Sequence, residues 1–155
     1  MKSALQEELR QSKPFGSLEQ EATLSVERTA NVLRHGIAEA LRPFGVTPAQ
    51  FNALRILRGA GADGLCRHEV GDRLVTQVPD VTRLLDRLEA AGLVVRQRDS
   101  EDRRLVTTRI TPEGLALLAR IDAPIAELHA RQLSHLGPEQ LRTLIDLLAL
   151  ARGHG

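Results

Sequence analysis

Thr82–Thr111 has the sequence TRLLDRLEAAGLVVRQRDSEDRRLVTTRIT, and this stretch decides the fold. Its first apolar residues recur every three or four positions, which predicts a helix from about Val78 to Ala91. The predicted buried face of that helix consists of Val81, Leu84, Leu85 and Leu88. Gly92 then serves as a left-handed cap, which ends the helix and lets Leu93 fold back onto its last turn.

A β-hairpin is predicted directly after this helix. Leu93–Arg98 and Arg104–Ile110 are rich in β-branched residues and flank four polar turn residues, 99–102. The arginines around the turn are Arg98, Arg103 and Arg104. A helix that can enter a groove, followed by a hairpin with arginines at its tip, is typical of a winged helix-turn-helix. We therefore expect the partner to be duplex DNA.

An arm and two helices are predicted in residues 1–59. Residues 1–16 are polar and form an arm with about one helical turn. Ser17 and Gln20 stand at capping-box spacing, so we expect a long helix to begin here and to end at Pro43. In the segment TPAQ at 47–50, the threonine is the N-cap, the proline occupies the first helical position and the glutamine stands at the third, as in a capping box. We therefore expect a second helix from here to Gly59.

The remaining elements are also marked by local signals. A loop is expected at 61–64 and a short helix at Arg67–Leu74. Thr111-Pro112 repeats the cap-and-proline start signal and opens another helix. Pro124 should kink or interrupt that helix, because proline removes a backbone donor and its ring clashes with the preceding turn. Gly137-Pro138 separates a last helix.

The pattern predicts a mainly α fold with a small β-wing, in a single domain spanning residues 1–155. Residues 47–111 are expected to form a winged helix-turn-helix DNA-binding lobe, and residues 1–46 and 112–155 a helical dimerisation region. The terminal helices have leucine-rich stripes without an obvious core of their own. Two copies of the chain could supply that core to each other as a homodimer; the alternative is that both stripes fold back within one chain.

The composition is consistent with this interpretation. The 155 residues carry a net charge of +1, so a local basic patch matters more than the total. No apolar run approaches the roughly 18 residues of a membrane span, and the start lacks an apolar signal core. One cysteine, Cys66, excludes an internal disulfide framework and fits a reducing compartment. We expect a cytoplasmic protein that does not interact with a membrane and that lies on genomic DNA when bound.

The outer face of the predicted reading helix supplies the candidate base contacts. With the apolar stripe turned inward, the residues left outside are Gln77, Pro79, Asp80, Thr82, Arg83 and Arg87. Arginine can donate two bonds to guanine O6 and N7, and threonine can touch a thymine methyl or a phosphate. The alternative is that Arg83 and Arg87 form an ordinary solvated face, paired with Asp86 or Asp80.

The hairpin tip supplies the second set of candidate contacts. A narrow minor groove has enhanced negative potential, which attracts an inserted arginine. Asp102 precedes the two tip arginines, and we expect it to support an arginine side chain rather than to face phosphate. The alternative is an exposed turn with compensating charges.

Residues 47–118 resemble the MarR (multiple antibiotic resistance regulator) family of bacterial transcription regulators. The matching segments are TPAQF at 47–51, VTRLLDRLE at 81–89, GLV at 92–94, DRR at 102–104 and ITPEG at 110–114. The resemblance implies a homodimeric repressor of a pseudo-palindromic operator, relieved by a small, often aromatic or phenolic, ligand. It places Thr82 and Arg83 at recognition-helix contacts, Arg104 in the minor groove and Asp102 in support of the wing.

The chain also departs from the family pattern. Gln77 stands where Ser or Thr is common, and Pro79-Asp80 replaces small hydroxyl residues. An acidic Asp80 near the groove lowers affinity for DNA unless it accepts from cytosine N4. The operator sequence is therefore not transferable from the family.

The family's effector pockets lie between the reading lobe and the dimer helices. Candidate pocket residues here are Arg34, His35, Phe44, Phe51 and Arg55, although they form no motif. Cys66 could instead make the protein a thiol-based redox sensor, since Arg67 and His68 would favour its thiolate. A buried, inert thiol is the preferred interpretation.

Other classes of function find no support. The histidines are scattered, so no metal site is predicted, and neither a phosphate loop nor a nucleophile elbow is present. We predict no cofactor and no enzymatic activity. The remaining alternative is a protein-interaction module that uses the winged-helix surface.

Overall fold

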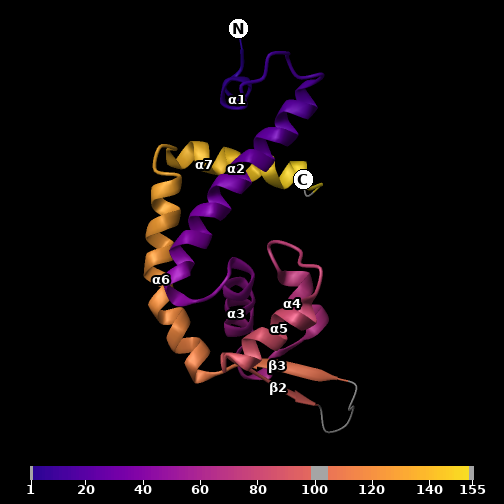
Figure 1. Cartoon of the computed structure of the whole chain (residues 1–155), viewed down its shortest axis with the longest axis vertical. Coiled ribbons are helices and arrows are strands. Elements are labelled where there is room, and N and C mark those ends of the chain that lie inside the picture. The colour runs from indigo at the N-terminus through magenta and orange to yellow at the C-terminus, as the bar shows by residue number, and fades with distance from the viewer. Residues whose placement is uncertain (1, 99–104, 154–155) are drawn as a thin grey trace.

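The computed structural model describes residues 2–98 and 105–153 (Figure 1). The helices are α1 (Ala4–Glu8), α2 (Leu18–Leu41), α3 (Pro48–Ala60), α4 (Arg67–Arg73), α5 (Val81–Ala90), α6 (Pro112–Gln132) and α7 (Pro138–Ala151), with 3-10 turns η1 (Arg42–Phe44) and η2 (Gly61–Asp63). The strands are β1 (Leu65–Cys66), β2 (Val94–Arg98) and β3 (Val106–Ile110), and they form one antiparallel sheet in the order β1-β3-β2. The predicted mainly α fold with a small β-wing is confirmed. No helix in the described part of the chain is long and apolar enough to cross a membrane.

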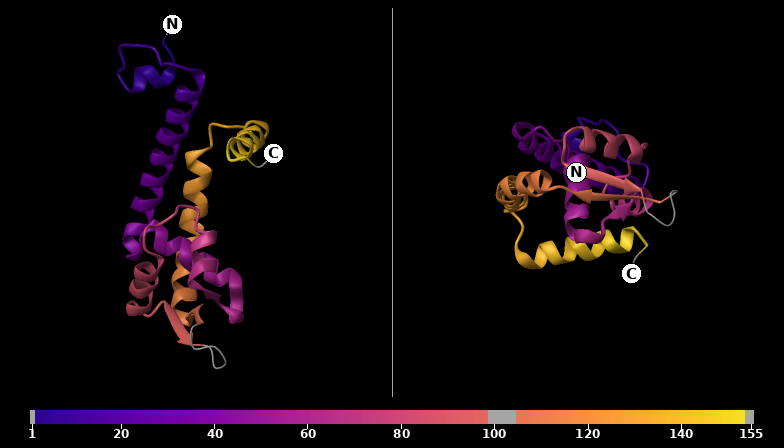
Figure 2. Two further views of the ribbon diagram at one scale, coloured as in Figure 1. Left: turned by 90° about the vertical axis from the view of Figure 1, so that its right-hand side faces the viewer. Right: turned by 90° about the horizontal axis from the view of Figure 1, so that it is seen from below.

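The molecule has a lobe at one end and long helices that extend away from it (Figures 1 and 2). α3, α4, α5 and the sheet form this winged lobe, while α2 and α6 run side by side toward the opposite end, where α7 crosses. Gly36 of α2 faces α6, and a Cβ at this position would meet the amide end of the Gln132 side chain. Gln132 Nε2 donates to the backbone oxygen of Leu33 at 3.0 Å across this contact.

One hydrophobic core joins the lobe to α6. Leu54 and Leu57 of α3 and Leu88 of α5 are fully buried in it. α6 contributes Leu118, Ile121 and Ile125 to the same cluster. The lower half of α6 is thus part of the lobe's core, and its upper half packs on α2.

The end of α5 and the start of α6 lie where the capping residues predicted them. Gly92 has φ 73°, and Leu93 N donates to Leu88 O at 3.0 Å, which closes the left-handed cap at the end of α5. Thr111 Oγ1 accepts from Gly114 N at 3.1 Å and donates to Gly92 O at 2.7 Å. This threonine therefore both caps α6 and ties its start to the end of α5.

The predicted start of the reading helix was wrong by three residues. α5 begins at Val81, and Asp80 is its N-cap, with Oδ1 accepting from Arg83 N at 2.9 Å. Pro79 lacks an N–H and disfavours helical backbone at Val78, so the first satisfied helical turn follows the aspartate.

Three further differences concern short or interrupted elements. The strand β1 was missed: it lies directly after the expected loop, and two residues are too few to show an alternating pattern. α3 continues one residue past Gly59. Pro124 does not interrupt α6, which remains assigned as one helix through it and changes direction about midway in Figure 1.

Candidate nucleic-acid interface

The N-terminal end of α5 carries the exposed side chains that a groove-reading helix needs. Leu84, Leu85 and Leu88 are buried and Val81 is partly buried, so the opposite face points outward. The exposed residues of the predicted set are Gln77, Pro79, Asp80, Arg83, Arg87 and Arg98. Asp102, Arg103 and Arg104, the predicted wing tip and its support, lie outside the described residues.

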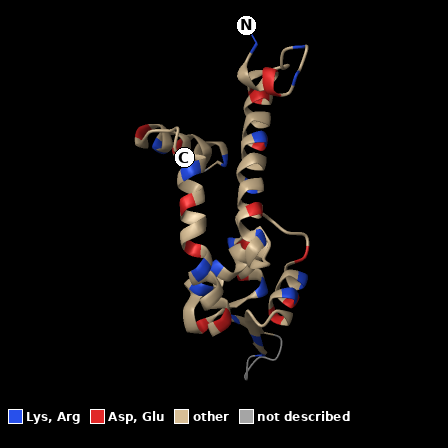
Figure 3. Cartoon of the chain, turned by 60° about the vertical axis from the view of Figure 1, so that its left-hand side comes forward, with Lys and Arg blue, Asp and Glu red and all other residues tan. Residues whose placement is uncertain are grey.

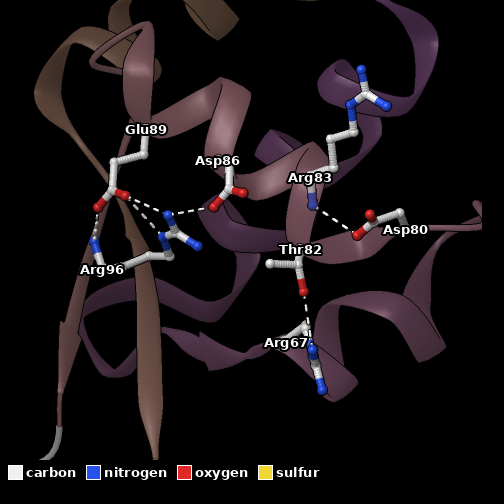
Figure 4. A network of polar contacts seen from close by, with 7 residues as sticks. All are labelled: Arg67, Asp80, Thr82, Arg83, Asp86, Glu89 and Arg96. Carbon is white, nitrogen blue, oxygen red and sulfur yellow. Dashed lines mark hydrogen bonds and ion pairs between the residues drawn. The ribbon is translucent and has the colours of Figure 1, made fainter.

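Thr82 differs from the other predicted contacts because it is half-buried. Its Oγ1 accepts from Arg67 Nη1 at 3.0 Å, so the hydroxyl turns toward α4, while the Arg83 side chain extends the other way (Figure 4). The sequence analysis did not single out Arg67 at this interface. No periodicity signals such a contact, because it joins residues 15 positions apart through a long side chain.

Arg96 connects the sheet to α5 (Figure 4). Its Nε and Nη2 donate to Glu89 Oε2 at 2.9 and 2.6 Å, and Nη2 also lies 2.6 Å from Asp86 Oδ1. The backbone N of Arg96 donates to Glu89 Oε1 at 3.1 Å. The guanidinium of Arg96 holds the pKa of Glu89 below its ordinary value, chiefly through the side-chain hydrogen bond. Asp86 thus pairs with a strand arginine, and not with the exposed arginines of its own helix.

The charges on the lobe are mixed in sign, as Figure 3 shows by the alternation of blue and red segments. Arg109 strengthens the sheet, because its Nε donates to Ala62 O at 2.6 Å and its Nη1 to Gln97 Oε1 at 3.1 Å. Arg96 and Arg109 are therefore structural cations, whereas Arg83 and Arg87 remain exposed on α5.

A second set of polar contacts joins the lobe to α6. Arg58 of α3 donates to both carboxylate oxygens of Asp122, at 2.6 and 3.1 Å. The hydrogen bond from Arg58 lowers the pKa of Asp122 and the same bond raises the pKa of Arg58. This bidentate pair fixes α3 against α6 beside the shared core.

The five predicted effector residues lie near this joint or along α2. Arg34, His35 and Arg55 are exposed, Phe44 is half-buried and Phe51 is buried. The Arg55 guanidinium lies 5.7 Å from the centroid of the Phe51 ring, and the Arg120 guanidinium lies 5.6 Å from that of Phe44. Both rings therefore already carry a cation on one face.

A pocket of about 440 Å³ lies elsewhere, between α4, α5 and the sheet. Its lining residues are Cys66, Arg67, His68, Thr82, Leu85, Arg96, Leu105, Val106 and Thr108. The five predicted effector residues do not line it. Within residues 2–98 and 105–153, no three His, Cys, Asp or Glu side chains are grouped as metal ligands would be.

α7 presents an apolar face without a partner in the described part of the chain. Among the residues described for this helix none is buried, and Ile145, Leu147 and Leu150 are each about 60 % exposed. Val26 and Val32 of α2 are also about half exposed. Burying such a surface against another molecule is favourable in proportion to its apolar area.

Comparison with known proteins identifies the family that shares this arrangement. A profile of the MarR family matches residues 44–105. The HTH-type transcriptional regulator YkoM of Bacillus subtilis is 34% identical over 125 residues, covering 80% of this chain and 79% of YkoM. A MarR transcription factor from Planctomyces limnophilus is 40% identical, with a TM-score of 0.68, covering 88% of this chain and 98% of that one. A mutant of MarR from E. coli, crystallised with operator DNA, is 26% identical with a TM-score of 0.77, covering 88% of this chain and 99% of that one.

The Arg96–Glu89 contact predicts how stability depends on pH. The pKa of Glu89 is lowered from its ordinary 4.5 in the folded chain, so this contact stabilises fully above that pH and is lost as the pH falls through the lowered pKa. We expect Glu89→Gln to lose less stability than the wild type as the pH is lowered from about 6 to about 3. Urea unfolding midpoints across this range measure the effect.

Asp122→Asn provides a second site for the same measurement. The hydrogen bond from Arg58 lowers the pKa of Asp122 from 3.8, so Asp122→Asn should likewise lose less stability than the wild type as the pH falls through that lowered pKa. A Glu89→Gln profile parallel to the wild type would contradict the expected role of the Arg96 contact.

Proposed function

Because the chain belongs to the MarR family of transcriptional regulators, we propose that it is a homodimeric repressor of a pseudo-palindromic operator, released from DNA by a small aromatic ligand. The observation that carries the proposal is the outward face of α5, with Arg83 near its start and Arg87 in its last turn, opposite a largely buried apolar stripe. The arginine-rich hairpin that follows α5 supports it.

Insertion of α5 into the major groove accounts for the exposed residues of the helix. The groove is about 12 Å wide and admits one helix, whose N-terminal residues meet base edges. Arg83 would bind guanine, with Gln77, Pro79 and Asp80 beside it, and Arg87 would contact the backbone. Arg104 would enter the minor groove, supported by Asp102 and flanked by Arg98 and Arg103. The E. coli MarR mutant was crystallised with operator DNA, which supports the same use of the fold here.

Dimerisation through the terminal helices would cover the exposed apolar faces of α7 and α2. A dimer places two α5 helices on one face of the duplex, about one helical turn apart, which matches a site with two-fold symmetry. The dimer would involve residues 1–46 and 112–155, with the winged lobe at 47–111.

Ligand release would act at the joint between the lobe and the long helices. Arg55 lies over the Phe51 ring, and Arg34 and His35 are exposed on α2; with Phe44 they offer cationic and aromatic groups, a suitable chemistry for an aromatic acid. The Bordetella bronchiseptica regulator BpsR, which has the same fold, is described as regulated in DNA binding by 6-hydroxynicotinic acid. A ligand releases DNA only to the extent that it prefers the non-binding geometry.

DNA binding is tested by two arginine substitutions. Arg83→Ala and Arg104→Ala should each weaken operator binding by about 1–3 kcal/mol, because each removes a charged contact to DNA. Fluorescence anisotropy with an operator recovered from genomic fragments measures the affinity. Arg131→Ala, an exposed arginine in the last turn of α6, is the control for net charge.

Salt dependence separates DNA binding from protein binding. Phosphate contacts release counterions, so the affinity should fall steeply as salt rises from about 50 to 200 mM. A curve on duplex DNA that is flat over this range would favour a protein-interaction module.

The dimer is tested by a charge in the apolar face of α7. Ile145→Glu should shift the protein toward monomer, because a carboxylate would be buried without a partner at the interface. Analytical ultracentrifugation measures the mass, and operator affinity should fall with it. Val75→Glu, which places the same charge on an exposed apolar side chain of the winged lobe, should leave the mass unchanged; a monomeric wild type would refute the proposal.

The ligand site is tested with a panel of phenolic and hydroxypyridine carboxylic acids. A binding acid at about 100 times its Kd should stabilise the fold by about 2.7 kcal/mol and lower the operator affinity. Arg55→Ala should abolish both effects, whereas Arg131→Ala should retain them. A panel that changes neither the Tm nor the affinity counts against an aromatic acid effector.

A further inference from the structure

Arg67, the first residue of α4, touches the reading helix although the predicted contacts did not include it. Its Nη1 donates to Thr82 Oγ1 at 3.0 Å (Figure 4). The Thr82 hydroxyl therefore faces α4 and has Arg67 as its hydrogen-bond donor. The two side chains form a pair at the end of α5 that is expected to enter the groove.

Arg67 keeps most of its binding capacity for another partner. A guanidinium has five N–H donors, and the contact with Thr82 uses one of them. The side chain is exposed, and within residues 2–98 and 105–153 no carboxylate lies within ion-pair distance of it. Arg96, drawn to the left of Thr82 in Figure 4, is instead paired with two carboxylates. Arg67 is thus a cation beside the reading helix with unused donors.

We propose that Arg67 bridges the DNA backbone and the reading helix: it binds a phosphate oxygen of the duplex and at the same time fixes the rotamer of Thr82. This inference rests on the proposed DNA-binding function. Phosphate contacts set the register of a protein on DNA, and base contacts select the sequence. The guanidinium of Arg67 would contact phosphate and hold Thr82 at the same time. It would thereby link the register of the protein on DNA to its choice of base. The planar fork of arginine suits this use, because its donors point in fixed directions.

The contact also predicts which DNA groups Thr82 selects. One lone pair of its hydroxyl is filled by a cationic donor, and the hydroxyl hydrogen remains available. The nearby positive charge favours an acceptor, such as purine N7, guanine O6 or thymine O4, and disfavours the amino group of cytosine. Arg67 therefore determines specificity through Thr82, without needing to contact a base itself.

A double-mutant cycle tests the bridge. Arg67→Ala should weaken operator binding about tenfold and reduce the slope of log affinity against log salt by about 1, since one phosphate contact is lost. Thr82→Val keeps the side-chain shape and removes the hydroxyl; it should weaken binding in the wild type and have little effect in the Arg67→Ala background. Arg67→Lys keeps the charge, so it should restore the salt slope.

Arg73→Ala is the matched control, because Arg73 is an exposed arginine in the last turn of the same helix. It should show no coupling to Thr82→Val. Selection from randomised duplexes measures the base preference of each variant. A purely structural role of Arg67 would not change that preference. Arg67→Ala and Thr82→Val should lose the same preference for an acceptor at one base position, while Arg73→Ala keeps it.

The outcomes are distinguishable. If Arg67→Ala keeps the wild-type affinity and salt slope, or if Thr82→Val costs the same in both backgrounds, Arg67 is not a bridge although DNA binding stands. If the wild type shows no salt-dependent binding to any duplex, the proposed function itself fails. Unchanged unfolding midpoints of the variants confirm that the comparison concerns folded protein.

Discussion

The burial of the apolar face of α5 determines the orientation of every group at the candidate interface. Leu84, Leu85 and Leu88 pack into the core that α3 and α6 share. Burying a leucine side chain contributes about 1.5–3 kcal/mol, whereas an exposed ion pair contributes about 0–1 kcal/mol. Packing, and not charge, therefore sets the rotation of the helix about its axis. That rotation leaves Arg83 and Arg87 outward, and it brings Asp86 and Glu89 within reach of β2.

Helix faces and helix ends that depend on neighbouring residues were predicted from the sequence. Contacts between residues far apart in the sequence were not. The buried stripe of α5, the cap at Gly92 and the start signals at 47–50 and 111–112 involve residues within one helical turn, so periodicity and capping rules reveal them. The two-residue strand β1 exists only because β3, about forty residues later, pairs with it. The contacts of Arg67 and Arg96 escaped prediction for the same reason: a long side chain can reach many neighbours, and the tertiary arrangement selects one.

The network at Arg96 draws two carboxylates of α5 toward the sheet. α5 carries two carboxylates beyond its first turn, Asp86 and Glu89, which would oppose a polyanion if they were free. Arg96 pairs with both from the sheet, at 2.6 Å from each, and so offsets one of the two negative charges. The Asp80 carboxylate accepts a hydrogen bond from the Arg83 backbone N–H. The negative charge of Asp80 therefore lies at the N-terminus of α5, where it is favourable. The three carboxylates at α5 thus each have a partner, while Arg83 and Arg87 stay exposed.

The contact between the winged lobe and α6 restricts how the lobe can move. It therefore restricts how a ligand could change the distance between the two reading helices of a dimer. α6 belongs to the lobe core through Leu118, Ile121 and Ile125, and Arg58–Asp122 fixes α3 against it. Interiors packed in this way do not deform continuously, so the lobe moves either with α6 or by repacking side chains. A tenfold change in DNA affinity needs only about 1.4 kcal/mol, which is comparable to the contribution of one buried contact. A ligand that displaces a single ring, such as that of Phe44, from its place against the core would therefore be sufficient, without unfolding any element.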